Sequence, residues 1–211
     1  MKNKSLYIIG GLVIIIILYF VLFGNNKVEY VEFTDKRAVR GDLEASVVMV
    51  EWSDFECPAC GLAYRTVEDV IEKYQDKIKY EYRHFPLPYH QYAYKAAVAS
   101  ECANEQGKFW EYYHKLFLNQ VNLSKGFLEQ YAKEIGLDTE LFDDCLASGV
   151  KEKIVTGDFE EGERIGINFT PSIFINGQLV EDWSKLESLV QELIEPVEAA
   201  KNQVNSDTVI Q

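Results

Sequence analysis

The chain has 211 residues, enough for one substantial domain with its own core and for extensions at both ends. Its formal net charge of −13 at pH 7 excludes the basic surface that a nucleic-acid-binding protein needs, so we expect no nucleic-acid partner. The four cysteines suit two pairs in an oxidising compartment.

The first predicted element is the uncharged apolar run over residues 6–23, which Lys2 and Lys4 precede. The run is just long enough to cross a bilayer as a helix, and no small-residue cleavage site follows it. We therefore expect a signal anchor over residues 1–24, with residues 6–23 in the lipid bilayer. Basic residues on both sides leave the orientation open by charge alone. Export is the usual fate of such a run, so we place the catalytic domain of a single-pass cell-membrane protein on the extracytoplasmic side.

Residues 25–45 are expected to form a spacer, with at most one strand at 28–33 and a turn at Arg40-Gly41-Asp42. The apolar run that follows predicts a buried strand over 46–53. Apolar residues at helical spacing predict a helix over 62–74, and alternation predicts a second strand over 77–84.

Between the first strand and this helix lies the motif Cys57-Pro58-Ala59-Cys60, an arrangement typical of redox-active thiols. A helix N-terminus would stabilise the Cys57 thiolate, and Pro58 suits a first turn because it has no N–H to leave unpaired. Cys60, one turn into the helix, is the natural resolving thiol. The alternative is half of a zinc site completed by other cysteines or histidines, but no second CxxC follows. We therefore expect a redox-active disulfide, no other cofactor and no metal.

Helical periodicity then continues to about residue 168. It predicts helices over 89–106, 108–118, 124–135, 138–147 and 151–165, with Ser124 and Asp138 as candidate N-caps. Cys102 and Cys145 lie in two of these helices, and their spacing from apolar neighbours predicts that both face a helical core.

The strand signal returns over 172–176, where Asn176-Gly177 predicts a hairpin turn to a strand over 178–181. Ser184 is the candidate cap of a last helix to residue 194, and 199–211 form a polar tail. The layout is an α/β domain over 46–198 that is split by a helical insertion at about 87–168.

Four motifs in this order resemble one family: "VEWSDFECPAC", "YRHFPLPYH", "AAVASECANEQGKFWEYYHKLF" and "TPSIFINGQLV". From about residue 46 to 194 the chain resembles the DsbA-like thiol:disulfide oxidoreductases of the thioredoxin superfamily. The resemblance implies an α/β thioredoxin fold with an inserted all-helical subdomain, preceded here by one N-terminal transmembrane helix.

The resemblance also implies roles for single residues. Thr170-Pro171 is expected to be a cis peptide beside Cys57 that holds a substrate strand, although Pro171 could simply begin a strand. Glu51 occupies the place of a buried acid that helps proton transfer at Cys60. A solvent-facing position is the alternative for Glu51, and two nearby acids, Asp54 and Glu56, are rival candidates.

Cys102 and Cys145 match a pair that the family joins as a structural disulfide, and two buried free thiols are the alternative. The three histidines, His84, His90 and His114, are expected to be packed or surface residues. Ala59 departs from family members that carry histidine inside the motif, which leaves the oxidising strength open.

The expected function is to introduce disulfides into exported or surface proteins that contain cysteines, with reoxidation by a quinone-linked membrane partner. A reductase or isomerase of the same fold is the first alternative. A non-enzymatic surface binding protein with structural disulfides is the second.

Overall fold

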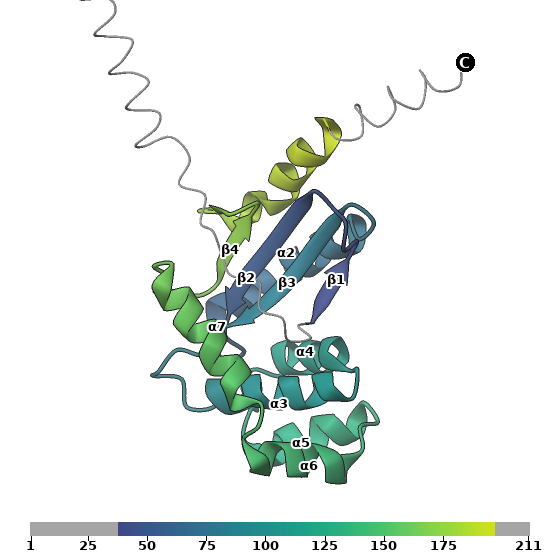
Figure 1. Ribbon diagram of the computed structural model, residues 1–211, viewed down its shortest axis with the longest axis vertical. Coiled ribbons are helices and arrows are strands. Elements are labelled where there is room, and N and C mark those ends of the chain that lie inside the picture. Colours follow the sequence, from purple (N-terminus) through teal and green to yellow (C-terminus); the bar gives the residue numbers. More distant parts are fainter. Residues whose placement is uncertain (1–37, 197–211) are drawn as a thin grey trace, which may run out of the picture.

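The computed structural model describes residues 38–196, and its centre is a five-stranded mixed sheet (Figure 1). Parallel strands β2 and β3 lie in the middle, and every other neighbouring pair is antiparallel. The strands are β1 Val39–Gly41, β2 Val47–Ser53, β3 Ile78–His84, β4 Ser172–Ile175 and β5 Gln178–Leu179, in the order β1-β3-β2-β4-β5. β2 is central and covered on both faces, which explains its nearly continuous apolar sequence.

Parallel strands need a crossover connection, and helix α2, Pro58–Lys73, supplies it between β2 and β3. Val67, Val70 and Ile71 recur at helical spacing along α2 and are buried in the main hydrophobic cluster with residues of the sheet. The last helix, residues 186–196, adds its apolar side chains to the same cluster.

Five helices separate β3 from β4 and form the inserted subdomain. They are α3 Ala93–Glu105, α4 Phe109–Leu118, α5 Lys125–Glu134, α6 Thr139–Ser148 and α7 Glu152–Arg164. Helices α3 to α6 pack on one another at one end of the sheet, while α7 runs back along it towards β4 (Figure 1). The chain therefore leaves the sheet at His84, the end of β3, and returns to it at Ser172, the start of β4, as an insertion of this kind requires.

Helix α7 helps to cover the sheet face opposite α2. Val50 and Trp52 on β2 point to that face, where they form a second cluster with Phe85 and Phe174. Gly162 on α7 permits the close approach, because a Cβ atom there would lie 2.7 Å from the Phe85 ring. Both faces of β2 are thus packed, and the loop after β2 starts from a rigid strand.

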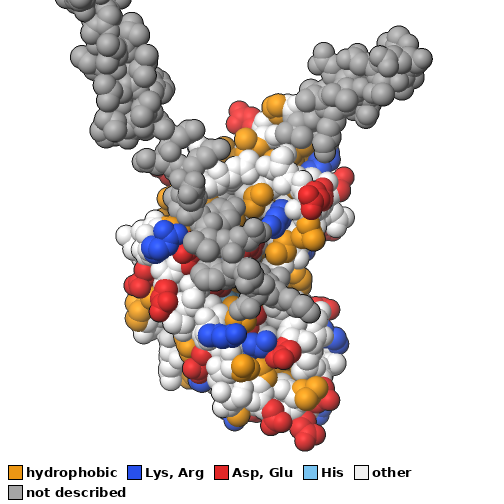
Figure 2. Space-filling view, in the orientation of Figure 1, with side chains coloured by type: hydrophobic (Ala, Val, Ile, Leu, Met, Phe, Trp, Pro, Cys, Tyr) orange, Lys and Arg blue, Asp and Glu red, His pale blue; other side chains and the backbone are white. Residues whose placement is uncertain are grey.

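On the face shown in Figure 2, acidic and basic side chains are mixed with apolar ones over the described part of the chain. Within residues 38–196 no helix has the length and hydropathy needed to span a membrane. The predicted anchor over 6–23, the strand over 28–33 and the tail over 199–211 lie outside the described residues.

The spacer prediction is wrong at its end, because Val39–Gly41 form strand β1 at the sheet edge, with Arg40 opposite Tyr80. Three residues are too few to show the alternation of a strand, so the sequence pattern missed it. Gly41 ends β1 with a φ of 87°, and a Cβ there would lie 2.1 Å from the carbonyl oxygen of Ile78. The tight contact with β3, rather than local pattern, fixes this strand.

Two predicted caps also need correction. Ser124 occupies the N-cap position of α5, but its side chain makes no capping hydrogen bond. Asp182, not Ser184, caps the start of the last helical segment, because its carboxylate accepts from the Ser184 N–H. Asp138 does cap α6, by accepting from the N–H groups of Glu140 and Leu141.

Candidate active site

The candidate site lies where β2 ends and α2 begins. Cys57 is the N-cap residue of α2, in an extended conformation with φ −72° and ψ 121°, and Pro58 opens the helix. The N–H of Cys57 donates to the Asp54 carbonyl at 3.1 Å, which closes the loop from the strand. Cys57 and Cys60 are both free thiols and both buried, with 6% and 0% of their surface exposed. The motif therefore places two thiols at a helix N-terminus, one of them fully covered.

The environment shifts the two thiols in opposite directions. The pKa of Cys57 is lowered to about 5, chiefly by the hydrogen bond from the Cys60 thiol, against a desolvation that raises it. The Thr170 hydroxyl and the N–H groups of Ala59 and Cys60 lower this pKa further. The pKa of Cys60 is raised well above its ordinary value by burial first, and then by its hydrogen bond and charge interaction with Cys57. At neutral pH these shifts favour a thiolate at Cys57 and a protonated thiol at Cys60.

Thr170 and Pro171 lie against Cys57 although they are far away in sequence. The Thr170–Pro171 bond is cis, and β4 begins directly after it, with Ser172 opposite Trp52 of β2. As a thiol, Cys57 donates from Sγ to the Thr170 carbonyl oxygen at 3.5 Å. The Thr170 hydroxyl has no hydrogen-bond partner among the described residues while Cys57 is a thiol. When Cys57 is a thiolate, this hydroxyl can donate a hydrogen bond to its sulfur.

Glu51 is a buried acid on β2, aligned with Tyr82 on the neighbouring strand. Desolvation raises its pKa to about 7, while hydrogen bonds with Ser53 and Tyr80 lower it in part. The Tyr80 hydroxyl donates to Glu51 Oε2 at 2.8 Å. The charge of Glu51 also contributes to the raised pKa of Cys60, so the two groups interact. Of the two positions left open for Glu51, the buried one is correct.

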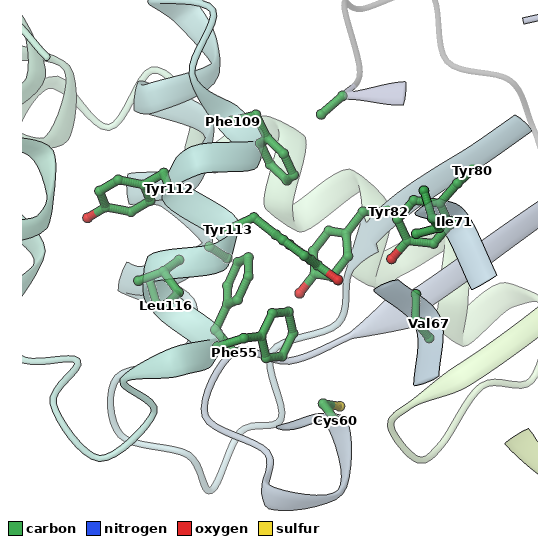
Figure 3. Packing of buried hydrophobic residues seen from close by; sticks show 14 of the residues in the cluster. Phe55, Cys60, Val67, Ile71, Tyr80, Tyr82, Phe109, Tyr112, Tyr113 and Leu116 are labelled. Carbon is green, nitrogen blue, oxygen red and sulfur yellow. The ribbon is translucent and has the colours of Figure 1, made fainter. Parts of the chain in front are cut away.

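Aromatic side chains surround this acid and the deeper thiol. Figure 3 shows Cys60 next to a cluster in which Phe55, Tyr82 and Tyr113 converge from the active-site loop, β3 and α4. Phe55 stacks on Tyr82 with ring centroids 5.2 Å apart, and Tyr82 meets Tyr113 edge-on at the same centroid distance. The low-polarity surroundings explain why burial dominates the pKa values of both Glu51 and Cys60.

The two rival acids are engaged in holding the loop before Cys57. Asp54 Oδ2 accepts from the Leu87 N–H at 2.8 Å and lies 2.7 Å from His90 Nδ1. Glu56 accepts from the Tyr92 N–H. These contacts also explain why α3 begins at residue 93 and not at 89, because they keep the preceding residues in a turn. His90 thus has a structural role beside the site.

The other histidines pair with residues outside the thiol motif. His84 is buried, with Nε2 3.0 Å from Glu101 Oε1. His114 Nδ1 lies 2.8 Å from the Tyr64 hydroxyl. Among residues 38–196, His, Cys, Asp and Glu side chains form no group of three or more that could hold a metal ion.

Cys102 and Cys145 form a disulfide that joins α3 to α6 across 43 residues of sequence. Cys102 is buried, but Cys145 is only partly covered. Cys102 belongs to the main hydrophobic cluster and Cys145 packs against it, so both cysteines face the helical core as predicted, although Leu141, one of the neighbours behind that prediction, is 60% exposed. The bond therefore fastens the inserted subdomain close to its surface.

One contact of the site has no signature in the sequence. Gln120, in the turn after α4, donates from Nε2 to the carbonyl oxygens of Phe55 and Cys57. Only the fold brings this amide next to the loop, so local spacing could not have pointed to it.

A family model described as thioredoxin matches residues 34–195. Among curated proteins, the chain is 42% identical over 147 residues to the Na(+)/H(+) antiporter NhaA 1 of Mycolicibacterium vanbaalenii, covering 68% of this chain and 24% of that protein. The antiporter NhaA 3 of Salinispora tropica is 38% identical over 145 residues, covering 68% and 22%. The chain thus spans about a quarter of the length of the curated relatives that it matches.

Solved structures share the fold. BdbD from Bacillus subtilis, in its oxidised form, has a TM-score of 0.70 at 23% identity and covers 82% of this chain and 98% of its own. The thiol-disulfide exchange protein alpha-DsbA2 from Wolbachia pipientis has a TM-score of 0.68 at 23% identity, with 76% and 89% covered. A thioredoxin-like oxidoreductase from Silicibacter pomeroyi has a TM-score of 0.67 at 25% identity, with 75% and 92% covered. The chain therefore belongs to the thioredoxin superfamily and has the fold of its DsbA-like thiol-disulfide oxidoreductases.

Proposed function

We propose that the chain introduces disulfides into exported proteins, as a membrane-anchored dithiol oxidase with its domain on the extracytoplasmic side. The observation that carries this proposal is the pair of opposite pKa shifts at Cys57 and Cys60. A low pKa at Cys57 stabilises the reduced form of the pair relative to the disulfide, which makes the pair an oxidant.

The reaction starts from the Cys57–Cys60 disulfide. A substrate thiolate attacks Cys57 Sγ, the bond to Cys60 breaks, and Cys60 leaves as a thiolate that takes up a proton. A second substrate thiolate then attacks the substrate sulfur of the mixed disulfide, which releases Cys57 as a thiolate. Two substrate thiols have been oxidised, and the enzyme pair has taken up the two electrons.

Glu51 is the group that we assign to the proton transfer. Its pKa of about 7 means that it can give a proton to the departing Cys60 thiolate and take it back when the pair is reoxidised. The raised pKa of Cys60 makes a stored proton necessary, because a thiolate at this buried position is unfavourable.

The partners follow from the same chemistry. Substrates are exported or surface proteins with pairs of cysteines, held beside the Thr170–Pro171 bond, and the reduced enzyme passes its electrons to a quinone-linked membrane protein. In a Cys60→Ala variant the Cys57 thiolate can still attack a disulfide of such a partner, but no Cys60 thiol is present to displace the partner again, so mixed disulfides at Cys57 should accumulate until reductant is added. A Cys57→Ala variant is the matched control and should retain none. We do not extend antiport to this chain, because the antiporters share with it only about a quarter of their length.

The direction of electron flow is tested by the reduction potential of the Cys57–Cys60 pair in glutathione buffers. An oxidase should give a value nearer about −120 mV, whereas a value near about −270 mV, like that of thioredoxin, would refute the oxidase and favour a reductase. Ala59 makes this measurement necessary, because it offers no side-chain donor to the thiolate. A non-enzymatic binding protein would instead show a Cys57 that does not react with thiol reagents at neutral pH.

A further inference from the structure

Gln120 contacts the redox loop from outside the motif. Its Nε2 lies 2.8 Å from the carbonyl oxygen of Cys57 and 3.0 Å from that of Phe55. Both hydrogens of one amide nitrogen are therefore used to hold the backbone on either side of Glu56. The Cys57 carbonyl also accepts the first hydrogen bond of α2, from the Gly61 N–H at 3.1 Å, so the amide is a second donor to the same oxygen.

Gly61 provides the room for this amide. A Cβ atom at position 61 would lie 1.9 Å from Gln120 Oε1 and 2.7 Å from its Cδ. A residue other than glycine at position 61 would therefore push the Gln120 amide away from the loop. The first turn of α2 and the turn after α4 are thus fitted to each other through these two residues.

The position of this contact gives it a chemical consequence. The N–H groups of Ala59 and Cys60 can stabilise the Cys57 thiolate only if Cys57 keeps its extended N-cap conformation. Pro58 has no N–H with which to help, so the carbonyl groups carry the constraint. A donor on the Cys57 carbonyl also offsets the partial negative charge of that oxygen near the sulfur.

We propose that Gln120 is a positioning residue of the redox site, whose amide holds the Phe55 and Cys57 carbonyl groups so that the Cys57 thiolate is stabilised. The proposal rests on the oxidoreductase function given above and adds a residue from the inserted subdomain to it. Since Gln120 follows α4, the helical subdomain acts on the thiol through hydrogen bonds to the backbone of the redox loop and does not serve only as a cover.

The test compares Gln120→Ala with the unsubstituted chain. We expect the Cys57 pKa, followed by thiolate absorbance, to rise by about one unit, since the Cys57 carbonyl oxygen loses one of its two donors. At pH 7 the equilibrium with glutathione should shift up to about tenfold towards the disulfide, or about 30 mV to more negative potential. Gln130→Ala is the matched control, because that amide binds only the exposed Glu134, and it should change neither quantity.

Gly61→Ala provides an independent perturbation. The methyl group should displace the Gln120 amide, a flexible end of a side chain, and shift the pKa in the same direction. In the Gln120→Ala background, Gly61→Ala should add little, because the amide is already gone, so the two effects should not be additive. Additive effects, or a Gln120→Ala variant that loses stability while keeping the pKa and the potential, would overturn the proposal.

The outcomes also separate the two proposals. An ordinary Cys57 pKa in the unsubstituted chain would overturn both of them. A low pKa that Gln120→Ala leaves unchanged would overturn only the role of Gln120.

Discussion

The burial of Glu51 makes a quantitative prediction about stability and pH. Its pKa is about 7 in the folded chain, against 4.5 for an ordinary glutamate. Below pH 4.5 the Glu51 carboxyl is protonated in both the folded and the unfolded chain, so it causes no loss of folding stability there. Between pH 4.5 and about 7 the unfolded chain releases this proton and the folded chain does not, so stability falls as the pH rises through this window. Above about pH 7 the folded chain also releases the proton, and stability falls no further on account of Glu51.

The size of the effect follows from the pKa difference, at about 1.4 kcal/mol per pKa unit. Replacing Glu51 by Gln should therefore raise the free energy of unfolding by about 3 kcal/mol at pH 8 and change it little at pH 4. Glutamine has nearly the shape of the protonated acid, and its carbonyl can accept the hydrogen bond that Tyr80 now donates.

The assay is urea unfolding of the two chains from pH 4 to pH 8.5. Both should carry Cys57→Ala and Cys60→Ala, so that the two thiols do not titrate in this pH range and the difference between the chains reports on Glu51 alone. The Cys102–Cys145 disulfide stays intact under these conditions. If the two stability curves run parallel from pH 4.5 to pH 8, Glu51 is not a buried neutral acid, and its assignment as proton donor to Cys60 fails with it.

Three further predictions concern other parts of the chain. The pKa of Cys57 is about 5, so the thiol is already a thiolate at pH 6 and its alkylation rate in the reduced protein should be nearly constant from pH 6 to pH 8. A tenfold rise in the rate per pH unit over this range would contradict the lowered pKa. Replacing both Cys102 and Cys145 by alanine opens a loop of 43 residues and should cost about 4 kcal/mol of unfolding free energy on the chain-entropy estimate, with the Cys57 pKa as an unchanged control readout. Gly162→Ala should cost about 1–3 kcal/mol in urea unfolding, because its methyl group would meet the Phe85 ring at 2.7 Å, whereas Gly157→Ala, which meets nothing within 4 Å, should cost nothing.

Local patterns predicted the elements that carry the chemistry. The strand before Cys57 and the helix after it follow from an apolar run and from helical spacing, since both depend on neighbours in sequence. The same holds for α6, where Asp138 accepts from two N–H groups as the N-cap pattern predicts. The family resemblance, which the comparisons confirm, then supplied the partner across the sheet at Thr170.

Other features depend on contacts that no spacing encodes. Alternation could not decide the burial of Glu51, because β2 is covered on both faces and neither side of it meets solvent. Gln120 reaches Cys57 across 63 residues of sequence, from a turn with no motif of its own. Leu141 is 60% exposed although its spacing from Cys145 suggested a core position, because an apolar residue on a short surface helix can lie in solvent.

The distance along the chain between the parts of the site bears on the order in which they can assemble during synthesis. Cys57 and its contact at Thr170 are separated by 113 residues, so a growing chain presents both thiols long before the segment that lies against them has been made. Cys102 and Cys145, by contrast, are both complete 25 residues before Thr170 is added. During synthesis the Cys102–Cys145 disulfide can therefore form before Thr170, the residue that completes the site around Cys57 and Cys60, has been added.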